Sequence, residues 1–530
     1  MTKINGIIRT AITISFPFYL LDITLIRYRK VNRDRFDCFL GYRLQPRRCG
    51  VSKKYQQVVD LITERIDKQS YQSGDKLPSI RDLSTQLAIS KNTVIRAYQQ
   101  LEASQRIEAH PRSGYVVTQL KSPATATVSE PGYVDLMSLS KEIMSLSLSH
   151  QVLPAGSAHP DTRFPAIRSL YAEIGRHSRY QTNIPSHYQL PPGNEVLLRQ
   201  LVFINQELGV TTSASDILIT HGAQQAISLS LQAITQPGDI VLVESPSYFG
   251  NLLLLESLGL KVVEIPASVT SGMDLNALEQ ALERWPVSAI IINPSFNNPT
   301  GFMMSEPDRL AFLALTKAIP IIEDDVFGGL AYGRRQLPLK ALDQENRVIY
   351  CSSLSKTLDS RLRIGWVIAG KYQHQIEKRL ITDNMGSLNL MQSAVGQFLT
   401  TGKYRQHLGK IRKSYARRQR LFFKLFTTEL DRFPWLQGQY HLSQPEGGFL
   451  CWLTLPEHAD CTDIYQEALR QNISILPGKM FSTQSQHNHC IRLSFANFDD
   501  NNQWKAGLKK LAQIIADHSN QISFNENHSK

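Results

Sequence analysis

Amine, hydroxyl and guanidinium groups lie close together in sequence around residue 356. Ser353 and Ser355 precede Lys356 by three residues and by one, and Arg363 follows it by seven. A lysine amine forms a Schiff base with a carbonyl compound when enough of it is neutral. Hydroxyls and a guanidinium can hold a phosphate through charge-assisted hydrogen bonds. Short clusters of this kind also occur in solvated loops and helix caps, so the rest of the chain decides between the two interpretations.

Polar or aromatic side chains follow four apolar runs upstream of this cluster. Each run is typical of a buried strand, and the side chains that follow are Ala223 and Gln224 after residues 217–219, Tyr248 after 240–243, Asn298 after 289–292 and Asp324 after 321–322. Open α/β sheets bind ligands at the carboxyl ends of their strands, and free amides at a helix start bind phosphate. Tyr248 offers an aromatic face, Asn298 can donate to a ring oxygen and Asp324 can keep a ring nitrogen protonated. The ordered set predicts a site for pyridoxal 5'-phosphate.

In this order the residues resemble the fold-type I pyridoxal-phosphate enzymes of the aspartate aminotransferase superfamily, over roughly residues 153 to 515. The resemblance implies an α/β domain of this fold type with a smaller C-terminal α+β subdomain. It also implies three catalytic residues: Lys356 forms the aldimine with the cofactor, Asp324 pairs with the pyridine nitrogen and Tyr248 stacks on the ring.

Further site residues are implied by the same resemblance. The cofactor contacts are Asn298 at the ring hydroxyl, Ala223, Gln224, Ser353, Ser355 and Arg363 around the phosphate, and Tyr188, which is donated across a dimer interface. Arg492 matches the arginine that holds a substrate carboxylate in a bidentate pair.

One position departs from the family pattern. Phe327 stands where the family commonly has a tyrosine, whose hydroxyl bonds the ring oxygen and stabilises its anion. Without that donor, the aldimine is harder to deprotonate. The departure puts efficient transamination in doubt and leaves cofactor binding unaffected.

A different pattern occupies residues 55–117. Apolar residues at helical spacing between Tyr55 and Ile66 predict a first helix, which ends before the glycine and proline at 74–78. Ser79 is expected to cap a short second helix, and residues 89–102 predict a third. Two short helices with polar residues on the first turns of the second fit a helix-turn-helix that reads the major groove. Residues 107–117 then predict a two-stranded wing.

This segment is closely similar to the winged-helix domains of the GntR regulators. It carries the strings Gly-Asp-x-Leu-Pro-Ser-x-Arg at 74–81 and Thr-Val-x-Arg-Ala-Tyr at 93–98. A winged helix of this type joined to a fold-type I domain resembles the MocR-type transcriptional regulators. The DNA-binding residues expected from these observations are Arg81, Lys91, Asn92, Thr93, Arg96 and Arg112.

The formal charge of +12 is unevenly distributed along the 530 residues. Residues 1–50 carry 10 basic and 3 acidic side chains, so they supply more than half of the excess. The prediction of DNA binding therefore rests on where charges are placed and not on their total. Six scattered cysteines show neither paired spacing nor a pattern of metal ligands, which indicates a reducing cytoplasmic interior.

These patterns predict four segments. Residues 1–50 are an extension that is disordered or arises from an upstream start codon, 51–118 form the winged helix, 119–152 are a linker and 153–530 form the aminotransferase-like domain. The apolar stretch at 11–26 resembles a signal sequence only superficially, because Pro17 and Asp22 interrupt it.

The principal functional hypothesis is a dimeric transcriptional regulator. It binds double-stranded operator DNA and senses a small amine or amino acid, or the cofactor itself, through an aldimine on Lys356. The alternative from another class is a working aminotransferase that the winged helix only tethers. The effector, the operator and the direction of regulation do not follow from the sequence.

Overall fold

The computed structural model describes residues 11–16, 19–24, 54–67, 71, 74–87, 89–103, 106–110, 114–117, 128, 130–137, 152–181, 183, 188–386 and 389–520. The chain divides into two compact units, residues 1–124 and residues 125–530. Among the described residues, no helix is long and apolar enough to cross a bilayer.

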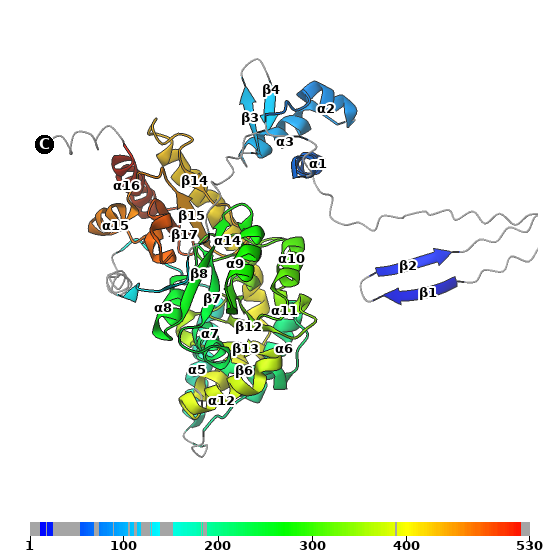
Figure 1. The fold of residues 1–530 in the computed structure, drawn as a ribbon, viewed down its shortest axis with the longest axis vertical. Coiled ribbons are helices and arrows are strands. Elements are labelled where there is room, and N and C mark those ends of the chain that lie inside the picture. Colours follow the sequence, from blue (N-terminus) through cyan, green and yellow to red (C-terminus); the bar gives the residue numbers. More distant parts are fainter. Residues whose placement is uncertain are drawn as a thin grey trace, which may run out of the picture. The chain divides into compact units, whose positions relative to one another are not determined.

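Among its described residues, the first unit contains three helices and a small antiparallel wing (Figure 1). The elements are α1 (Lys54–Asp67), α2 (Ile80–Gln86), α3 (Lys91–Ala103), β3 (Ile107–His110) and β4 (Gly114–Val117). The Ser79 hydroxyl accepts a hydrogen bond from the Asp82 amide at 3.2 Å and caps α2, as expected for serine before a helix. The Tyr98 hydroxyl of α3 donates to the Pro78 carbonyl at 2.7 Å. The predicted winged helix is confirmed.

Apolar residues from all three helices form the core of this domain. Val58 and Ile62 of α1 pack in one cluster with Leu83 of α2 and with Val94 and Tyr98 of α3. The edge of the Tyr98 ring also meets Tyr115 in the wing, with centroids 4.8 Å apart. This packing leaves the polar first turns of α3 at the surface.

Residues 11–24 contain an antiparallel pair, β1 (Ala11–Phe16) and β2 (Tyr19–Thr24). This pair was not predicted from the sequence. The other residues of the 1–50 extension lie outside the described residues, so the expectation for that extension stays a prediction.

The second unit is built on a large mixed sheet, of which Figure 1 labels β6, β7, β8, β12 and β13. The sheet has nine strands in the order β5-β8-β7-β10-β11-β12-β13-β6, with β9 beside β8. The strands are β5 (Gly132–Tyr133), β6 (Ile217–Thr220), β7 (Ile240–Ser245), β8 (Lys261–Ser268), β9 (Gly272–Met273), β10 (Val287–Ile292), β11 (Ile321–Asp324), β12 (Val348–Ser353) and β13 (Gly365–Ile368). Strands β8, β7, β10, β11 and β12 run parallel. Their carboxyl ends therefore meet at one edge, where an open sheet places its ligands.

Both faces of the large sheet are buried. Along β10, Ala289 and Ile291 belong to one apolar cluster with Ile227 of α7, while Ile290 and Ile292 belong to another with Phe312 of α10. Alternate residues of a strand point to opposite faces, and a parallel sheet covered on both sides reads as a continuous apolar run. This explains why the runs before the site residues lack a polar alternation.

Helices cover the large sheet and connect it to a smaller one. They are α5 (Pro165–Gln181), α6 (Glu195–Glu207), α7 (Ala223–Ile234), α8 (Phe249–Ser257), α9 (Leu275–Arg284), α10 (Glu306–Thr316), α11 (Leu339–Leu342), α12 (Gln373–Asn384), α13 (Asn389–Thr400), α14 (Lys403–Leu430), α15 (Cys461–Arg470) and α16 (Asn502–His518). The small antiparallel sheet has the order β14-β15-β17-β16, with β14 (His441–Leu442), β15 (Leu450–Thr454), β16 (Leu476–Pro477) and β17 (Cys490–Ser494). The predicted α/β domain with a smaller C-terminal subdomain is confirmed.

Candidate functional site

Lys356 lies in the turn after β12 and is half-buried. Its Nζ donates to the Ala158 carbonyl at 2.9 Å. Burial and the charges of Arg492 and Arg363 lower the pKa of Lys356 to about 8, although Asp324 acts in the opposite direction. A lysine with this pKa has a far larger neutral fraction near pH 7 than an ordinary one, and only the neutral amine attacks a carbonyl.

Asp324 ends β11, and its side chain is buried. Burial and the neighbouring Asp325 raise the pKa of Asp324 to about 7, whereas Lys356 counteracts the rise. Its Oδ1 is buried without a hydrogen-bond partner among the described residues. A buried oxygen in this condition costs stability unless a donor reaches it. The carboxylate therefore fits a group that brings its own N–H, as a protonated ring nitrogen does.

Several groups that suit a phosphate meet at the start of α7. Gly222 precedes that helix with a φ of 82°, and a Cβ on it would come within 2.7 Å of an Arg363 guanidinium nitrogen. That guanidinium donates to the His221 carbonyl at 3.1 Å, and the Arg363 side chain remains exposed. The Ser353 hydroxyl donates to that of Ser355 at 2.7 Å. Hydroxyls, a guanidinium and the first amides of a helix form a cradle for an anion.

A second set of side chains lies near the aromatic ring of Tyr248. Arg492 on β17 donates to the Asn298 side-chain oxygen at 3.2 Å and to the Gly156 carbonyl at 2.5 Å. Burial lowers the pKa of Arg492 to about 10, and its Nε is buried without a hydrogen-bond partner in the described structure. Burial, followed by the charge of Asp324, raises the pKa of Tyr248. We call Tyr248, Asn298, Asp324, Lys356, Arg363 and Arg492 the Lys356 cluster.

Two features that support this cluster were missed in the sequence. A Cβ on Gly250 would come within 2.5 Å of the Tyr248 ring, so the ring position requires glycine there. Glu244 accepts hydrogen bonds from the Asn293 amide at 2.9 Å and from the Asn297 side chain at 3.0 Å. Burial raises the pKa of Glu244 to about 7. Glu244 thereby ties the end of β7 to the loop that carries Asn298, and neither its type nor its spacing signals that role.

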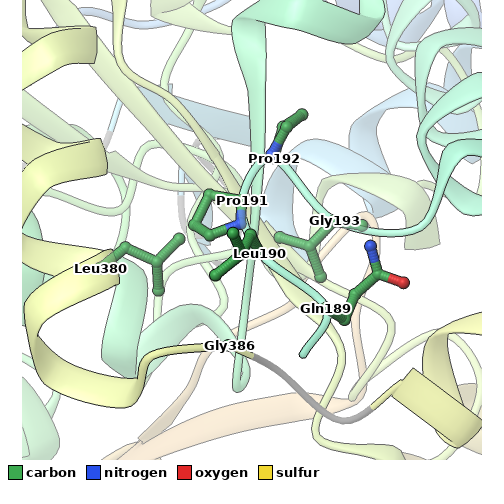
Figure 2. Close-up of a pocket in the computed structure, with 8 residues that line it drawn as sticks. Gln189, Leu190, Pro191, Pro192, Gly193, Leu380 and Gly386 are labelled. Atoms are coloured by element: carbon green, nitrogen blue, oxygen red, sulfur yellow. The ribbon is translucent and has the colours of Figure 1, made fainter. Parts of the chain in front are cut away.

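Tyr188 differs from the cluster in its environment. Its side chain is 76% exposed, whereas Asn298, Asp324 and Arg492 are buried. Figure 2 shows the segment that follows it, Gln189 to Gly193, running past Leu380 of α12 and Gly386. The Pro192 carbonyl accepts from the Ile219 amide at 3.0 Å, which attaches this segment to β6. Within one chain, Tyr188 is held at the surface.

Phe327 packs edge-on against Phe449, with ring centroids 5.3 Å apart, and is 1% exposed. The Lys356 amine lies 5.9 Å from its centroid. The phenylalanine therefore borders the Lys356 cluster.

The polar residues of the first unit are arranged on α2 and α3. Lys91, Asn92 and Arg96 of α3 and Arg81 of α2 are exposed. The Arg96 guanidinium lies over the Tyr55 ring, 4.4 Å from its centroid, a stacking that sequence spacing did not reveal. Thr93 is half-buried, and its hydroxyl lies 2.8 Å from that of Ser90. Arg112 lies outside the described residues.

Each of the two units matches a known protein family. Residues 54–117 match the bacterial regulatory proteins of the gntR family, and residues 159–506 match aminotransferase class I and II. Two uncharacterized HTH-type transcriptional regulators of Escherichia coli K12 resemble almost the whole chain. YdcR is 36% identical over 87% of this chain and 99% of its own length, and YjiR is 34% identical over 87% and 98%. The chain belongs to the MocR-type transcriptional regulators.

Solved aminotransferases share the fold of the regulator's second unit. LysN, the alpha-aminoadipate aminotransferase of Thermus thermophilus, was solved with N-(5'-phosphopyridoxyl)-L-leucine; it is 26% identical, with a TM-score of 0.63 over 71% of this chain and 94% of that one. The kynurenine aminotransferase of Pyrococcus horikoshii, solved with PMP, is 27% identical, with a TM-score of 0.63 over 72% and 94%. The match to the gntR family indicates that the regulator binds DNA. Its aminotransferase-like domain is related to proteins that were solved with phosphopyridoxyl groups.

Proposed function

We propose that this regulator senses a small amine or amino acid through pyridoxal 5'-phosphate held on Lys356. When bound, the cofactor supplies an aldehyde that joins amines reversibly. The observation that supports this best is that the Lys356 cluster combines an amine whose pKa is about 8 with a buried carboxylate oxygen that has no hydrogen-bond partner among the described residues. A neutral amine can attack the aldehyde of the cofactor. A buried carboxylate that lacks a donor can accept from the protonated nitrogen of the pyridine ring.

Different side chains are expected to contact the cofactor ring, its phosphate and the effector. Asp324 is expected to accept the ring N–H, Tyr248 to cover the ring face and Asn298 to donate its amide to the ring oxygen. Ser353, Ser355, Arg363, Ala223 and Gln224 are expected to hold the phosphate. Arg492 is left to pair with the carboxylate of an amino-acid effector, since no described residue accepts from its Nε.

A homodimer is part of the proposal. Tyr188 is exposed on a segment anchored to β6, which suits a hydroxyl that reaches the phosphate of a second subunit. Paired winged helices would then read two half-sites of operator DNA in the cytoplasm. An effector that binds one arrangement of the subunits better than another shifts the population between them and so changes DNA binding.

The deciding experiment exposes the purified, cofactor-loaded protein to a panel of amines and amino acids. A spectral change without release of keto acid, together with altered operator affinity, is the expected result. Catalytic turnover to the keto acid would instead favour the working aminotransferase, and a response to cofactor alone would favour a sensor of the cofactor. The second candidate is kept because the groups that transamination needs lie together in the Lys356 cluster.

Phe327→Tyr tests the doubt about transamination. The new hydroxyl is expected to donate to the ring oxygen and to stabilise its anion, and so to lower the pKa at which the visible absorbance of the bound cofactor changes. A spectrophotometric pH titration measures the shift. Phe449→Tyr adds the same hydroxyl to the ring packed against Phe327 and serves as the control. An unchanged or higher pKa in Phe327→Tyr would show that residue 327 does not act on the ring oxygen.

Arg96→Ala tests the proposed recognition helix. We expect operator binding to weaken by about 1–3 kcal/mol if Arg96 reads a base, or the salt dependence to fall by about one unit if it contacts a phosphate. Tyr55→Leu should give part of the same loss, because the Tyr55 ring positions the guanidinium. Gln99→Ala, at an exposed position on the same helix, is the control. Unaltered affinity and salt dependence in Arg96→Ala would place the DNA-reading surface elsewhere.

A further inference from the structure

A cavity of about 220 Å³ lies beside the Lys356 cluster and shares Ser353 with the proposed phosphate cradle. Asp325 and Thr357, the sequence neighbours of Asp324 and Lys356, line the cavity together with Ser353. Residues of α6 and α14 line another side. Asp324, Lys356 and the other members of the cluster do not line it. A liquid water occupies about 30 Å³, so the space exceeds what one or two waters need.

Two guanidiniums line this cavity, and one of them is incompletely paired. Arg335 donates through one terminal nitrogen to Asp325 at 3.2 Å, while its Nε and its other terminal nitrogen are buried without a hydrogen-bond partner in the described structure. Arg412 donates through Nε to the Gly329 carbonyl at 2.7 Å. Buried donors of a charged group cost folding free energy unless something accepts from them.

Two acidic side chains, Asp325 and Glu207, line the cavity with these guanidiniums. One oxygen of Asp325 accepts from Arg335 and from the Tyr350 hydroxyl at 2.7 Å, while its other oxygen lies against Gly328 without a partner among the described residues. Glu207 is paired with Arg405 at 2.6 Å. The charge of Glu207 also acts on Arg412. The two carboxylates therefore balance the two guanidiniums in formal charge, and the distinctive feature of the lining is the set of Arg335 donors for which no described residue is an acceptor.

The unpaired guanidinium donors and the size of the cavity together define the ligand. Guanidinium donors in a fixed fork bind carboxylates and phosphates in preference to other groups. The volume lies below the range of about 300–1,000 Å³ for drug-sized ligands. We propose that this cavity is a second ligand site, which holds a small carboxylate or phosphate between Arg335 and Arg412.

The position of the cavity connects it to the cofactor site. Ser353, which lines the cavity, donates to Ser355 in the proposed phosphate cradle. Thr357 follows Lys356 directly and accepts from the Tyr404 hydroxyl at 2.9 Å. An anion that draws Arg335 away from Asp325 alters the charge next to Asp324. The second site thus modulates the first without contacting the effector.

Calorimetric titration of the full chain with succinate and with inorganic phosphate tests the site, and it requires neither cofactor nor DNA. We expect the wild type to bind at least one of the two, and Arg335→Gln and Arg412→Gln each to weaken that binding about tenfold or more, as removal of a charged hydrogen bond does. Arg334→Gln changes an exposed neighbouring arginine and should bind like the wild type. The two probes distinguish a carboxylate ligand from a phosphate ligand.

Three outcomes would overturn the second site. The first is no binding of either probe to the wild type. The second is equal binding by Arg335→Gln, Arg412→Gln and the wild type. The third is binding that disappears in Arg492→Gln or Arg363→Gln and persists in Arg335→Gln, which would assign the anion to the Lys356 cluster. Circular dichroism checks that each variant is folded, and Arg412→Gln carries the test if Arg335→Gln is not. Failure of the proposed sensing function would leave this result unaffected.

Discussion

Lys356→Ala is expected to abolish covalent attachment of pyridoxal 5'-phosphate and to leave a folded protein. The side chain donates a hydrogen bond to the Ala158 carbonyl, and its amine is held in a site that lowers its pKa to about 8. Loss of one hydrogen bond from a charged group costs about 1.5–3 kcal/mol, which is less than the about 5–15 kcal/mol that stabilises a typical domain, so the fold should tolerate the change. Mass spectrometry after borohydride reduction and the visible absorbance of the protein measure attachment.

Lys340→Ala is the matched control for this result. Burial lowers the pKa of Lys340 too, but its amine donates to the Asn346 side chain and to the Val348 carbonyl, at the opposite end of β12 from Lys356. Attachment should survive in this variant. Attachment that persists undiminished in Lys356→Ala would assign the cofactor to another lysine.

Arg492→Gln is expected to remove the response to amino acids while cofactor attachment continues. Each hydrogen bond to a charged group contributes about 1.5–3 kcal/mol, so the loss of a paired guanidinium should weaken amino-acid binding by about 100-fold or more. An amine without a carboxylate has no such contact to lose and should bind as it does to the wild type. Spectral titration with an amino acid and with its decarboxylated amine measures both.

The exposed Arg470→Gln provides the control for a general loss of positive charge. Equal losses for the amino acid and the amine would mean that Arg492 supports the site structurally, through Asn298 and Gly156. An unchanged affinity for the amino acid would remove Arg492 from the effector site.

Much of the site's framework was predictable, because strand ends and helix starts have strong local signals. The apolar runs before Tyr248, Asn298 and Asp324 correctly located β7, β10 and β11, since a sheet buried on both faces needs apolar residues at every position. Ser79 correctly marked the start of α2, because its side chain can satisfy a free amide. The functional roles of the site residues stay predictions.

What escaped prediction depends on contacts between distant segments. The stacking of Arg96 on Tyr55 joins residues on α3 and α1, and no spacing rule connects them. The need for glycine at 250 arises only when the Tyr248 ring is in place. The unpaired nitrogens of Arg335 emerge only from a full account of hydrogen bonds in the described structure. Each is a property of packing, and periodicity carries no information about it.

The position of β6 has a consequence for synthesis of the chain. β6 is the first of the sheet's long strands in sequence, yet it pairs with β13, with Thr220 opposite Gly365. Gly222 and Arg363 become neighbours only through this pairing, so the proposed phosphate cradle has no existence in a nascent chain that ends before residue 368. A chain truncated after the winged helix and before this residue contains all described elements of the winged helix and lacks the proposed cradle. We therefore expect such a fragment to keep the DNA-binding domain without the site through which we propose that the effector acts.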